Sequence, residues 1–217
     1  MKKHRNSQKR IIFEDAVYFV TSKTHNNYPY FRERVFCPPE RTRSVRAGDL
    51  FVENLRLCKR LKGFLLYGWV LNYDHFHSQI QPNDEWNISK VMQFLKRHIS
   101  RDINYVMGYN NYDHHYSGGD IRECRLQGGM YKYFRPIIKK HDKKLNLLKS
   151  QFQQKYSTGH PFPKFRWKKT FHDEYIRNDK SFDNLLGYIE YNPDKHGLPP
   201  NWPYIYTNPK YEDLTDE

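Results

Sequence analysis

The sequence predicts an α+β fold with a mainly antiparallel sheet. Segments with the two-residue alternation of strands and segments with the helical spacing of apolar residues both occur, but they do not alternate regularly along the chain. With 217 residues, the chain is long enough to bury a core. We expect a single domain over residues 1–217, with residues 105–165 as an insertion and flexible ends at 1–12 and 205–217.

The first half of the chain contains most of the expected strands. A β-branched and aromatic run predicts a first strand over residues 16–21. Apolar residues at helical spacing predict a first helix over 50–61. An apolar run over 64–71 and an alternating segment over 75–80 then predict two strands joined by a short turn.

Three more helices are expected after these strands. An apolar stripe over residues 88–103 predicts the first of them. The insertion differs in composition from the rest and contains a lysine-rich helix within 137–156. A last helix is expected over 181–192, and we expect Pro193 to end it.

The composition favours a binding partner that is a polyanion. The formal net charge is +13, and aromatic residues make up 17% of the chain. Positive charge attracts phosphates, and aromatic rings offer faces on which unpaired bases stack. A mean hydropathy of −0.99 and the absence of a long apolar stretch exclude a membrane span and a signal peptide. Three cysteines without a C-x-x-C pair indicate neither a disulfide framework nor structural zinc, so we expect a reduced, cytoplasmic protein.

His75 and His77 are candidate metal ligands. Two residues apart on a strand, their imidazoles project from the same face and can converge on one ion. The pair is a weak signal alone, because an exposed or ladder-forming pair has the same spacing. Two imidazoles do not complete a site for a hard cation such as Mg²⁺ or Mn²⁺, so an oxygen ligand is also needed.

Tyr188 and Asn192 are the candidates on the last helix. Four residues apart, they fall on one flank of its apolar stripe and can point into the same cleft, whereas Tyr191 projects almost opposite that stripe. The alternatives are a half-buried packing tyrosine and a polar residue near the helix end.

A tyrosine beside a two-histidine metal site in a basic protein suits attack on a phosphodiester. A phenol is a poor nucleophile at neutral pH until a cation or a base stabilises the phenolate. A metal ion on the phosphate oxygens also stabilises the more anionic transition state. The products would be a covalent phosphotyrosine and a free sugar hydroxyl.

These residues resemble a known family. The chain resembles the HUH single-tyrosine transposases of the IS200-like group, and within it the REP-associated tyrosine transposases. The most specific segment is 188–198, which reads Tyr-Ile-x-x-Asn-Pro-x-Lys-x-Gly-Leu. The other matching segments are 18–22 with Phe31, 72–77, 91–97, Trp167, 171–173 and 176–177. Together the matching segments span about two thirds of the chain.

The resemblance implies a role for each candidate. His75 and His77 would be metal ligands, Tyr188 the nucleophile, and Asn192 the position from which the last helix completes or supports the metal site. It also implies a ferredoxin-like core, with the histidines on a central strand and the tyrosine on a helix laid across it. The implied activity is cleavage and rejoining of single-stranded DNA beside a hairpin, through a 5′-phosphotyrosine and a 3′-hydroxyl. The site would lie within a monomer or across a homodimer.

The chain departs from the family pattern in the turn before the histidines. The family usually has Met-Pro-Asn there, whereas this chain has Asn72, Tyr73 and Asp74. Asp74 would either orient the imidazole of His75 or cap the turn, and we favour the cap.

Basic residues outside the motifs are weaker candidates for DNA binding. On the helix over 88–103 they are Lys96, Arg97 and Arg101, and in the insertion they are Lys139, Lys140, Lys143 and Lys144. Both groups could contact hairpin phosphates, but a solvated charged face is the ordinary reading of such runs.

Two other functions compete with a transposase. A non-catalytic nucleic-acid-binding protein on the same scaffold would explain the charge and the aromatic residues, but not the combination of His75, His77, Tyr188 and Asn192. A replication initiator or conjugative relaxase would share the two-histidine chemistry, but the segment after Tyr188 favours the transposases.

Overall fold

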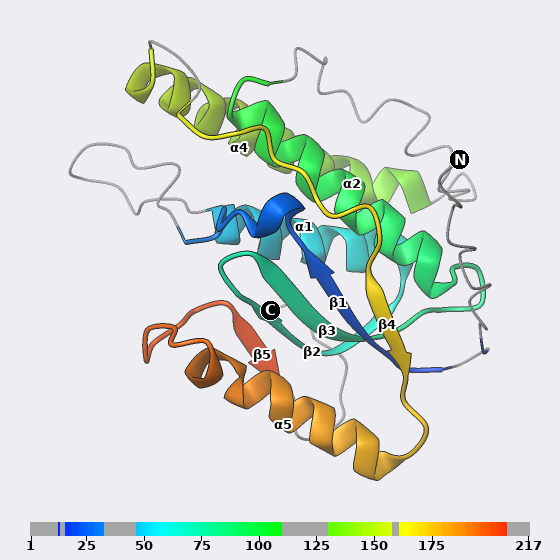
Figure 1. Cartoon of the computed structure of the whole chain (residues 1–217). Coiled ribbons are helices and arrows are strands. Elements are labelled where there is room, and N and C mark those ends of the chain that lie inside the picture. The colour runs from blue at the N-terminus through cyan, green and yellow to red at the C-terminus, as the bar shows by residue number, and fades with distance from the viewer. Residues whose placement is uncertain (1–12, 14–15, 33–46, 110–129, 158–160, 208–217) are drawn as a thin grey trace, which may run out of the picture.

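A single five-stranded antiparallel sheet organises the protein (Figure 1). The computed structural model describes residue 13 and residues 16–32, 47–109, 130–157 and 161–207. The strands lie in the order β4-β1-β3-β2-β5. Their bounds are Tyr18–Lys23 for β1, Leu65–Leu71 for β2, His75–Gln81 for β3, His172–Tyr175 for β4 and Ile205–Thr207 for β5.

The connections between the strands are those of a ferredoxin-like fold. Helix α1 (Ala47–Lys62) joins β1 to β2, and helix α2 (Ile88–Val106) follows β3. Helix α4 (Met130–Lys155) is inserted between α2 and β4, which returns to pair with β1. A short 3₁₀ turn, His25–Asn27, follows β1. The order β-α-β-β-α-β confirms the predicted α+β class, with β5 as an additional edge strand.

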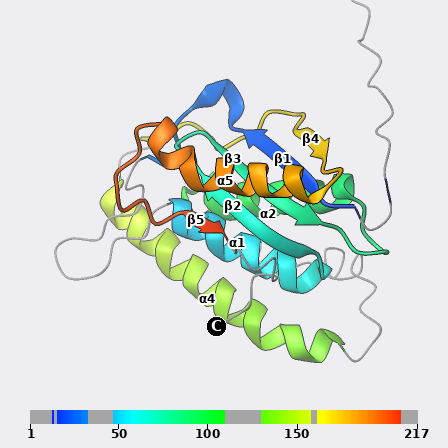
Figure 2. The same cartoon turned by 90° about the horizontal axis from the view of Figure 1, so that it is seen from below.

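The helices cover both faces of the sheet in layers. Figure 1 shows α1 and α2 on one face, with α4 packed outside them, and α5 (Asp179–Lys195) on the other face. The view from below in Figure 2 shows α5 crossing the strands on its own side of the sheet. Consequently α4 and α5 lie on opposite sides of the sheet.

The alternation of side chains along β3 separates two groups of residues. Phe76 and Ile80 join the main hydrophobic core under α1 and α2. His75, His77 and Gln79 face α5, where the Gln79 side-chain amide donates to the carbonyl of Phe182 at 2.9 Å. This arrangement confirms the faces predicted from the two-residue period. A smaller apolar cluster under α5, built on Phe19, Val70, Ile176 and Ile189, holds that helix against the sheet.

Pro193 does not end the last helix, contrary to our prediction. Helix α5 continues to Lys195. A proline lacks a backbone N–H and crowds the carbonyl four residues earlier, which is tolerated here because only the last turn follows. The backbone N–H of His196 closes that turn by donating to the carbonyls of Asn192 at 3.1 Å and Pro193 at 3.2 Å.

The expected flexible end from residue 205 is wrong for its first three residues. They form β5, which pairs with β2 from Val70↔Ile205 to Gly68↔Thr207. The strand is short and lies at the edge of the sheet, so it leaves little periodicity in the sequence. Residues 208–217 and the other expected flexible end, 1–12, lie outside the described residues.

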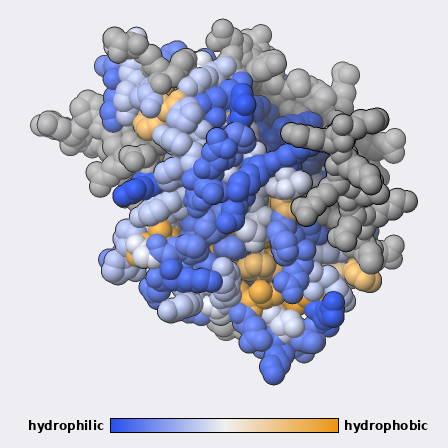
Figure 3. Space-filling model, viewed as in Figure 1, coloured by the Kyte–Doolittle hydropathy of each residue, from blue (hydrophilic) through white to orange (hydrophobic). Residues whose placement is uncertain are grey.

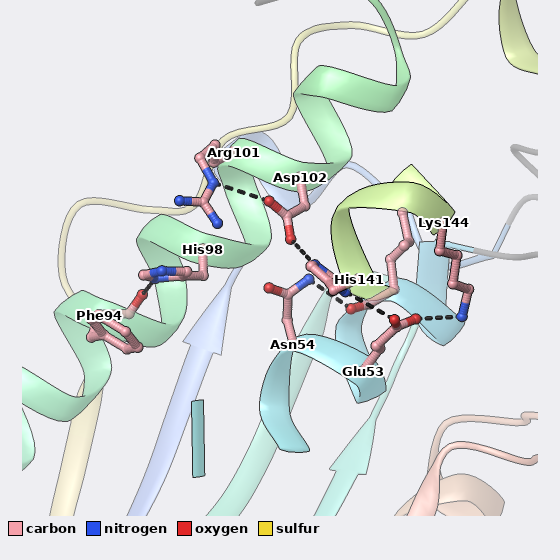
Figure 4. A network of polar contacts seen from close by, with 9 residues as sticks. Glu53, Asn54, Phe94, His98, Arg101, Asp102, His141 and Lys144 are labelled. Carbon is pink, nitrogen blue, oxygen red and sulfur yellow. Dashed lines mark hydrogen bonds and ion pairs between the residues drawn. The ribbon is translucent and has the colours of Figure 1, made fainter. Parts of the chain in front are cut away.

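A buried ionic network fastens α4 to α1 and α2 (Figure 4). The His141 ring lies between two carboxylates, 2.9 Å from Glu53 on α1 and 2.7 Å from Asp102 on α2. Asp102 is fully buried and also accepts from Arg101 at 3.0 Å, while Lys144 pairs with Glu53 at the exposed end. The predicted insertion helix is therefore fixed by charge as well as by its apolar stripe.

The network shifts the pKa values of its members in opposite directions. Burial alone would lower the pKa of His141, but its bonds to Asp102 and Glu53 raise the pKa to about 9. Burial alone would raise the pKa of both carboxyl groups, but hydrogen bonds to His141 hold the pKa of Asp102 well below its ordinary value and also lower the pKa of Glu53. His141 is thus a cation at neutral pH.

The free energy of unfolding should decrease on both sides of neutral pH. The contribution of His141 is complete below its unfolded pKa of about 6.5 and is lost as the pH rises through 9, a loss of roughly 3 kcal/mol. The contributions of Asp102 and Glu53 are present above about pH 4 and are lost as the pH falls below it. Urea unfolding between pH 3 and 10 measures the alkaline loss and the beginning of the acid loss. In His141→Gln the alkaline loss should be reduced, and an unchanged alkaline loss would contradict this assignment.

The surface seen in the view of Figure 1 is mostly hydrophilic (Figure 3). Apolar areas on this face are small and separate, and one of them lies where α5 meets the sheet. Among the described residues, no helix is both long and apolar enough to cross a bilayer.

Candidate active site

The two predicted histidines lie side by side under α5. His75 and His77 occupy the central strand β3, with their ring centroids 5.0 Å apart and the ring planes nearly perpendicular. Each is only 6% exposed. The strand period places both imidazoles on the face opposite the main core, as predicted, and α5 closes over them.

His77 presents one ring nitrogen without a partner. Its Nδ1 lies 2.7 Å from the hydroxyl of Thr21 on β1, and its ring stacks on Phe19 at 5.4 Å. Its Nε2 is buried and has no hydrogen-bond partner among the described residues. Burial, followed by the electrostatic effects of His75, His196, Lys23 and Lys195, lowers the pKa of His77 to about 3. The ring is therefore neutral, and the tautomer with the proton on Nδ1 leaves a free lone pair on Nε2.

His75 is held at both ring nitrogens. Its Nδ1 lies 2.6 Å from the Asp74 carboxylate, and its Nε2 lies 2.9 Å from the side-chain amide nitrogen of Asn72. Burial lowers the pKa of His75 although Asp74 opposes this effect. Our preference for Asp74 as a turn cap is wrong, because its carboxylate orients the imidazole instead.

Tyr188 and Asn192 both reach toward the histidines from α5. Asn178 caps the N-terminus of the helix, and Leu186 and Ile189 anchor its apolar stripe on the sheet. The ring of Tyr188 meets His77 edge-on at 5.3 Å. Asn192 is fully buried, and its side-chain oxygen accepts from Asn72 at 2.6 Å. The structure thus brings all four predicted site residues into one region.

Tyr191 points away from this region. It lies three residues after Tyr188 on the same helix and is 63% exposed. The prediction from helical geometry that Tyr191 projects away from the buried stripe is confirmed, and the residue offers a natural control for Tyr188.

Positive charges surround the site. The Nζ of Lys195 lies 4.8 Å from the centroid of the Tyr188 ring, and the ring of His196 lies 5.0 Å from that of His75. Lys23, the cross-strand partner of His75, ends β1 and is exposed. Burial and then Lys195 lower the pKa of His196. Such a cationic rim favours an anionic substrate.

The candidate ligand atoms of His75, His77 and Asn192 fit a divalent metal ion. The buried, unpaired Nε2 of His77 is the kind of atom that a ligand normally satisfies. The Nε2 of His75 and the side-chain oxygen of Asn192 both point at one donor, the amide nitrogen of Asn72. Within the described residues, no three His, Cys, Asp or Glu side chains form a metal-ligand cluster, so the set would combine two imidazoles with an amide oxygen.

The predicted DNA-binding residues of α2 have structural partners. Lys96 donates to the carbonyl of Lys168 at 2.7 Å and so fixes the segment before β4. Arg101 is paired with Asp102, whereas Arg97 is exposed. Two of these three side chains therefore already support the fold.

The predicted lysines of α4 lie far from the histidines. Lys139, Lys140, Lys143 and Lys144 are exposed, but α4 and the site are separated by the α1/α2 layer and the sheet (Figure 1). Lys144 is also paired with Glu53. Contact with hairpin phosphates remains a prediction for these residues.

Sequence reasoning missed Asn72 and Thr21 as site residues. Thr21 is the cross-strand partner of His77, which the strand prediction alone could not align. Asn72 contacts Asn192 across 120 positions of the sequence. Its only signal was that it precedes the histidines in a turn where the resembling family has a different residue.

Comparisons with known proteins leave the family open. No protein-family model matches the chain, and no curated protein matches it. A solved structure of a REP-associated tyrosine transposase bound to a REP hairpin is similar at a TM-score of 0.44 and 16% identity. The match covers 94% of this chain and 82% of that chain. At this TM-score and identity, the similarity by itself assigns neither a family nor a function to this chain.

Proposed function

We propose that the protein cleaves and rejoins single-stranded DNA with Tyr188 as the nucleophile, as a transposase acting at hairpin sequences. The observation that carries this proposal is the position of the Tyr188 ring against His77, whose buried Nε2 has no partner in the described part of the chain. The Tyr188 phenol is half-buried beside an unpaired imidazole nitrogen and a rim of positive charge. A buried polar atom without a partner costs free energy, so packing alone does not explain this arrangement. The motif over residues 188–198 supports the same assignment.

The reaction transfers a phosphoryl group from DNA to the protein. The phenolic oxygen of Tyr188 bonds to the phosphorus, and the bond from phosphorus to the 3′-oxygen breaks. The phenolic proton is lost, and the departing 3′-oxygen gains a proton to become a hydroxyl. The phosphotyrosine linkage conserves the free energy of the cleaved phosphodiester bond. A 3′-hydroxyl can therefore reverse the step and join the strands.

A divalent cation is the cofactor that the candidate ligand atoms would hold. His75, His77 and Asn192 would bind Mg²⁺ or Mn²⁺, which would polarise the phosphate and stabilise the negative charge of the transition state. Asp74 and Thr21 would keep the imidazoles in the neutral tautomers that ligation needs. Lys195 and Lys23 would attract the flanking phosphates.

The alternative is a protein that binds nucleic acid without cutting it. The net charge of +13 and the aromatic content would fit either function. The adjacent, buried pair of imidazoles favours catalysis, because a surface that only binds phosphates gains nothing from histidines that are 6% exposed.

The wild-type protein should form a covalent adduct with hairpin-containing single-stranded DNA. We expect the adduct only in the presence of Mg²⁺ or Mn²⁺, because a metal held by His77 and Asn192 would stabilise the negative charge of the reacting phosphate. End-labelled hairpin oligonucleotides from the host genome, resolved on a denaturing gel, measure the adduct. The same sequences as full duplexes should give none.

His77→Ala separates the two functions. The variant should bind the hairpin within about twofold of wild type, because the positive charges remain, but should lose the adduct by about 10²-fold or more. If wild type binds hairpins tightly but never forms an adduct with any of them, the binding-only alternative is correct.

A further inference from the structure

The side-chain amide of Asn72 lies between two atoms that the proposed metal would need. Its Nδ2 is 2.9 Å from the Nε2 of His75 and 2.6 Å from the side-chain oxygen of Asn192. Both atoms are acceptors that converge on this one N–H₂ group. Ligand atoms converge on a metal ion in the same way, so the amide nitrogen stands close to where a cation would be bound.

The hydrogen-bond network fixes the orientation of this amide. The Asp74 carboxylate only accepts, so the His75 proton lies on Nδ1 at 2.6 Å from it. The Nε2 of neutral His75 is then an acceptor, and Asn72 must present its N–H₂ group rather than its oxygen. The same orientation supplies the donor that the oxygen of Asn192 requires.

The site is nevertheless incompletely satisfied. The side-chain oxygen of Asn72, the side-chain nitrogen of Asn192 and the Nε2 of His77 are all buried and have no partner among the described residues. Buried polar atoms of native proteins normally have partners. These three unpaired atoms belong to side chains that contact His75 or Asn72, which indicates that a further group binds in this region. The amide of Asn72 satisfies two acceptors but leaves its own oxygen unpaired.

The backbone of Asn72 is held independently of its side chain. Its N–H donates to the carbonyl of His75 at 2.7 Å, which closes the turn between β2 and β3, and the residue is 1% exposed. The turn therefore does not depend on the hydrogen bonds of the side chain.

We propose that Asn72 is a displaceable occupant of the metal site: its amide pairs with His75 and Asn192 in the metal-free protein and rotates away when the cation binds. This proposal rests on the proposed function, since it assumes a metal at these ligands. Asn72 is thus a positioning residue that sets the affinity for the metal. It keeps both acceptors aligned in the free protein, and it competes with the cation for them.

Removing the amide should strengthen metal binding. We expect Asn72→Ala to lower the Mn²⁺ dissociation constant by about fivefold, because the competing hydrogen bonds are gone. Asn72→Asp should lower it by about tenfold or more, because a carboxylate of the same shape cannot donate and adds an oxygen ligand. Isothermal titration of the full-length, metal-free protein with MnCl₂ measures both constants, and thermal melts with and without Mn²⁺ give a second readout.

Matched variants separate this proposal from its alternatives. Asn54→Ala removes a buried amide elsewhere in the core and should leave Mn²⁺ affinity unchanged. If Asn72→Ala and Asn72→Asp both bind Mn²⁺ no more tightly than wild type while His77→Ala loses binding, the metal site is correct and the role of Asn72 is wrong. If His77→Ala binds as wild type does, the metal site itself is wrong, and this proposal falls with it. Should the alanine variant fail to fold, the isosteric aspartate variant decides.

Discussion

Tyr188→Phe eliminates the covalent protein–DNA adduct, with a loss of at least about 10³-fold in its rate of formation. Phenylalanine keeps the ring that packs edge-on against His77 and Phe19 and removes only the hydroxyl. Without an oxygen at this position, the ring of residue 188 cannot form a bond to phosphorus. A time course on a denaturing gel with end-labelled hairpin DNA measures the rate.

Tyr191→Phe is the matched control for this substitution. Tyr191 lies on the same helix, three residues on, but is 63% exposed and points away from the histidines. Its removal should leave the adduct rate within about twofold of wild type. Tyr188→Phe should also bind Mn²⁺ as wild type does, which separates loss of the nucleophile from loss of the site. Adduct formation by Tyr188→Phe at the wild-type rate would remove this residue from the mechanism.

Asp102→Ala lowers the free energy of unfolding by about 3 to 5 kcal/mol. The substitution leaves the His141 cation buried between helices with only Glu53 to balance it, and it also removes the partner of Arg101. The midpoint of thermal unfolding should decrease by roughly 10 °C for a chain of this size. Urea denaturation followed by circular dichroism gives the free energy directly.

The loss of unfolding free energy depends on whether the substituted residue lies at the buried or the exposed end of the network. Lys144→Ala removes the exposed end of the network and should cost less than about 1 kcal/mol. The double variant Asp102→Ala/His141→Ala should be less destabilised than the sum of the single variants, because it leaves no unpaired buried cation. If Asp102→Ala costs less than about 1 kcal/mol, the ionic network does not fasten α4.

The sequence predicted those elements whose apolar pattern is strong. The stripe of α2 and the alternation along β3 follow from burial on one face, so their type and orientation were clear from periodicity. The edge strands β4 and β5 were missed, because they have four and three residues and carry little apolar pattern. Pairing with β1 and β2, rather than local sequence, makes them strands.

The parts of the candidate site that lie on a single strand or a single helix were predictable. The spacing of His75 and His77 on a strand and of Tyr188 and Asn192 on a helix placed each pair on one face. The contacts between these elements were not predictable. The bond from Asn72 to Asn192 joins a turn to a helix 120 residues later, and only the folded chain brings them together.

The network around His141 was not predictable from the sequence for the same reason. The apolar stripe of α4 was visible, but its polar residues gave no sign that His141 would meet Glu53 and Asp102 from two other helices. A lysine-rich helix therefore suggested DNA binding, whereas part of its polar surface serves to attach it to the fold. Buried ion pairs between distant elements have no local pattern that could predict them.

The covalent adduct itself provides the most direct test of the central claim. Wild-type protein is incubated with hairpin-containing single-stranded DNA and Mn²⁺, digested with protease and nuclease, and analysed by tandem mass spectrometry. We expect one modified peptide, with a nucleotide 5′-phosphate on the phenolic oxygen of Tyr188, and a free 3′-hydroxyl on the other DNA product. An adduct on any other residue, or cleavage that leaves no protein-linked nucleotide, would contradict this claim.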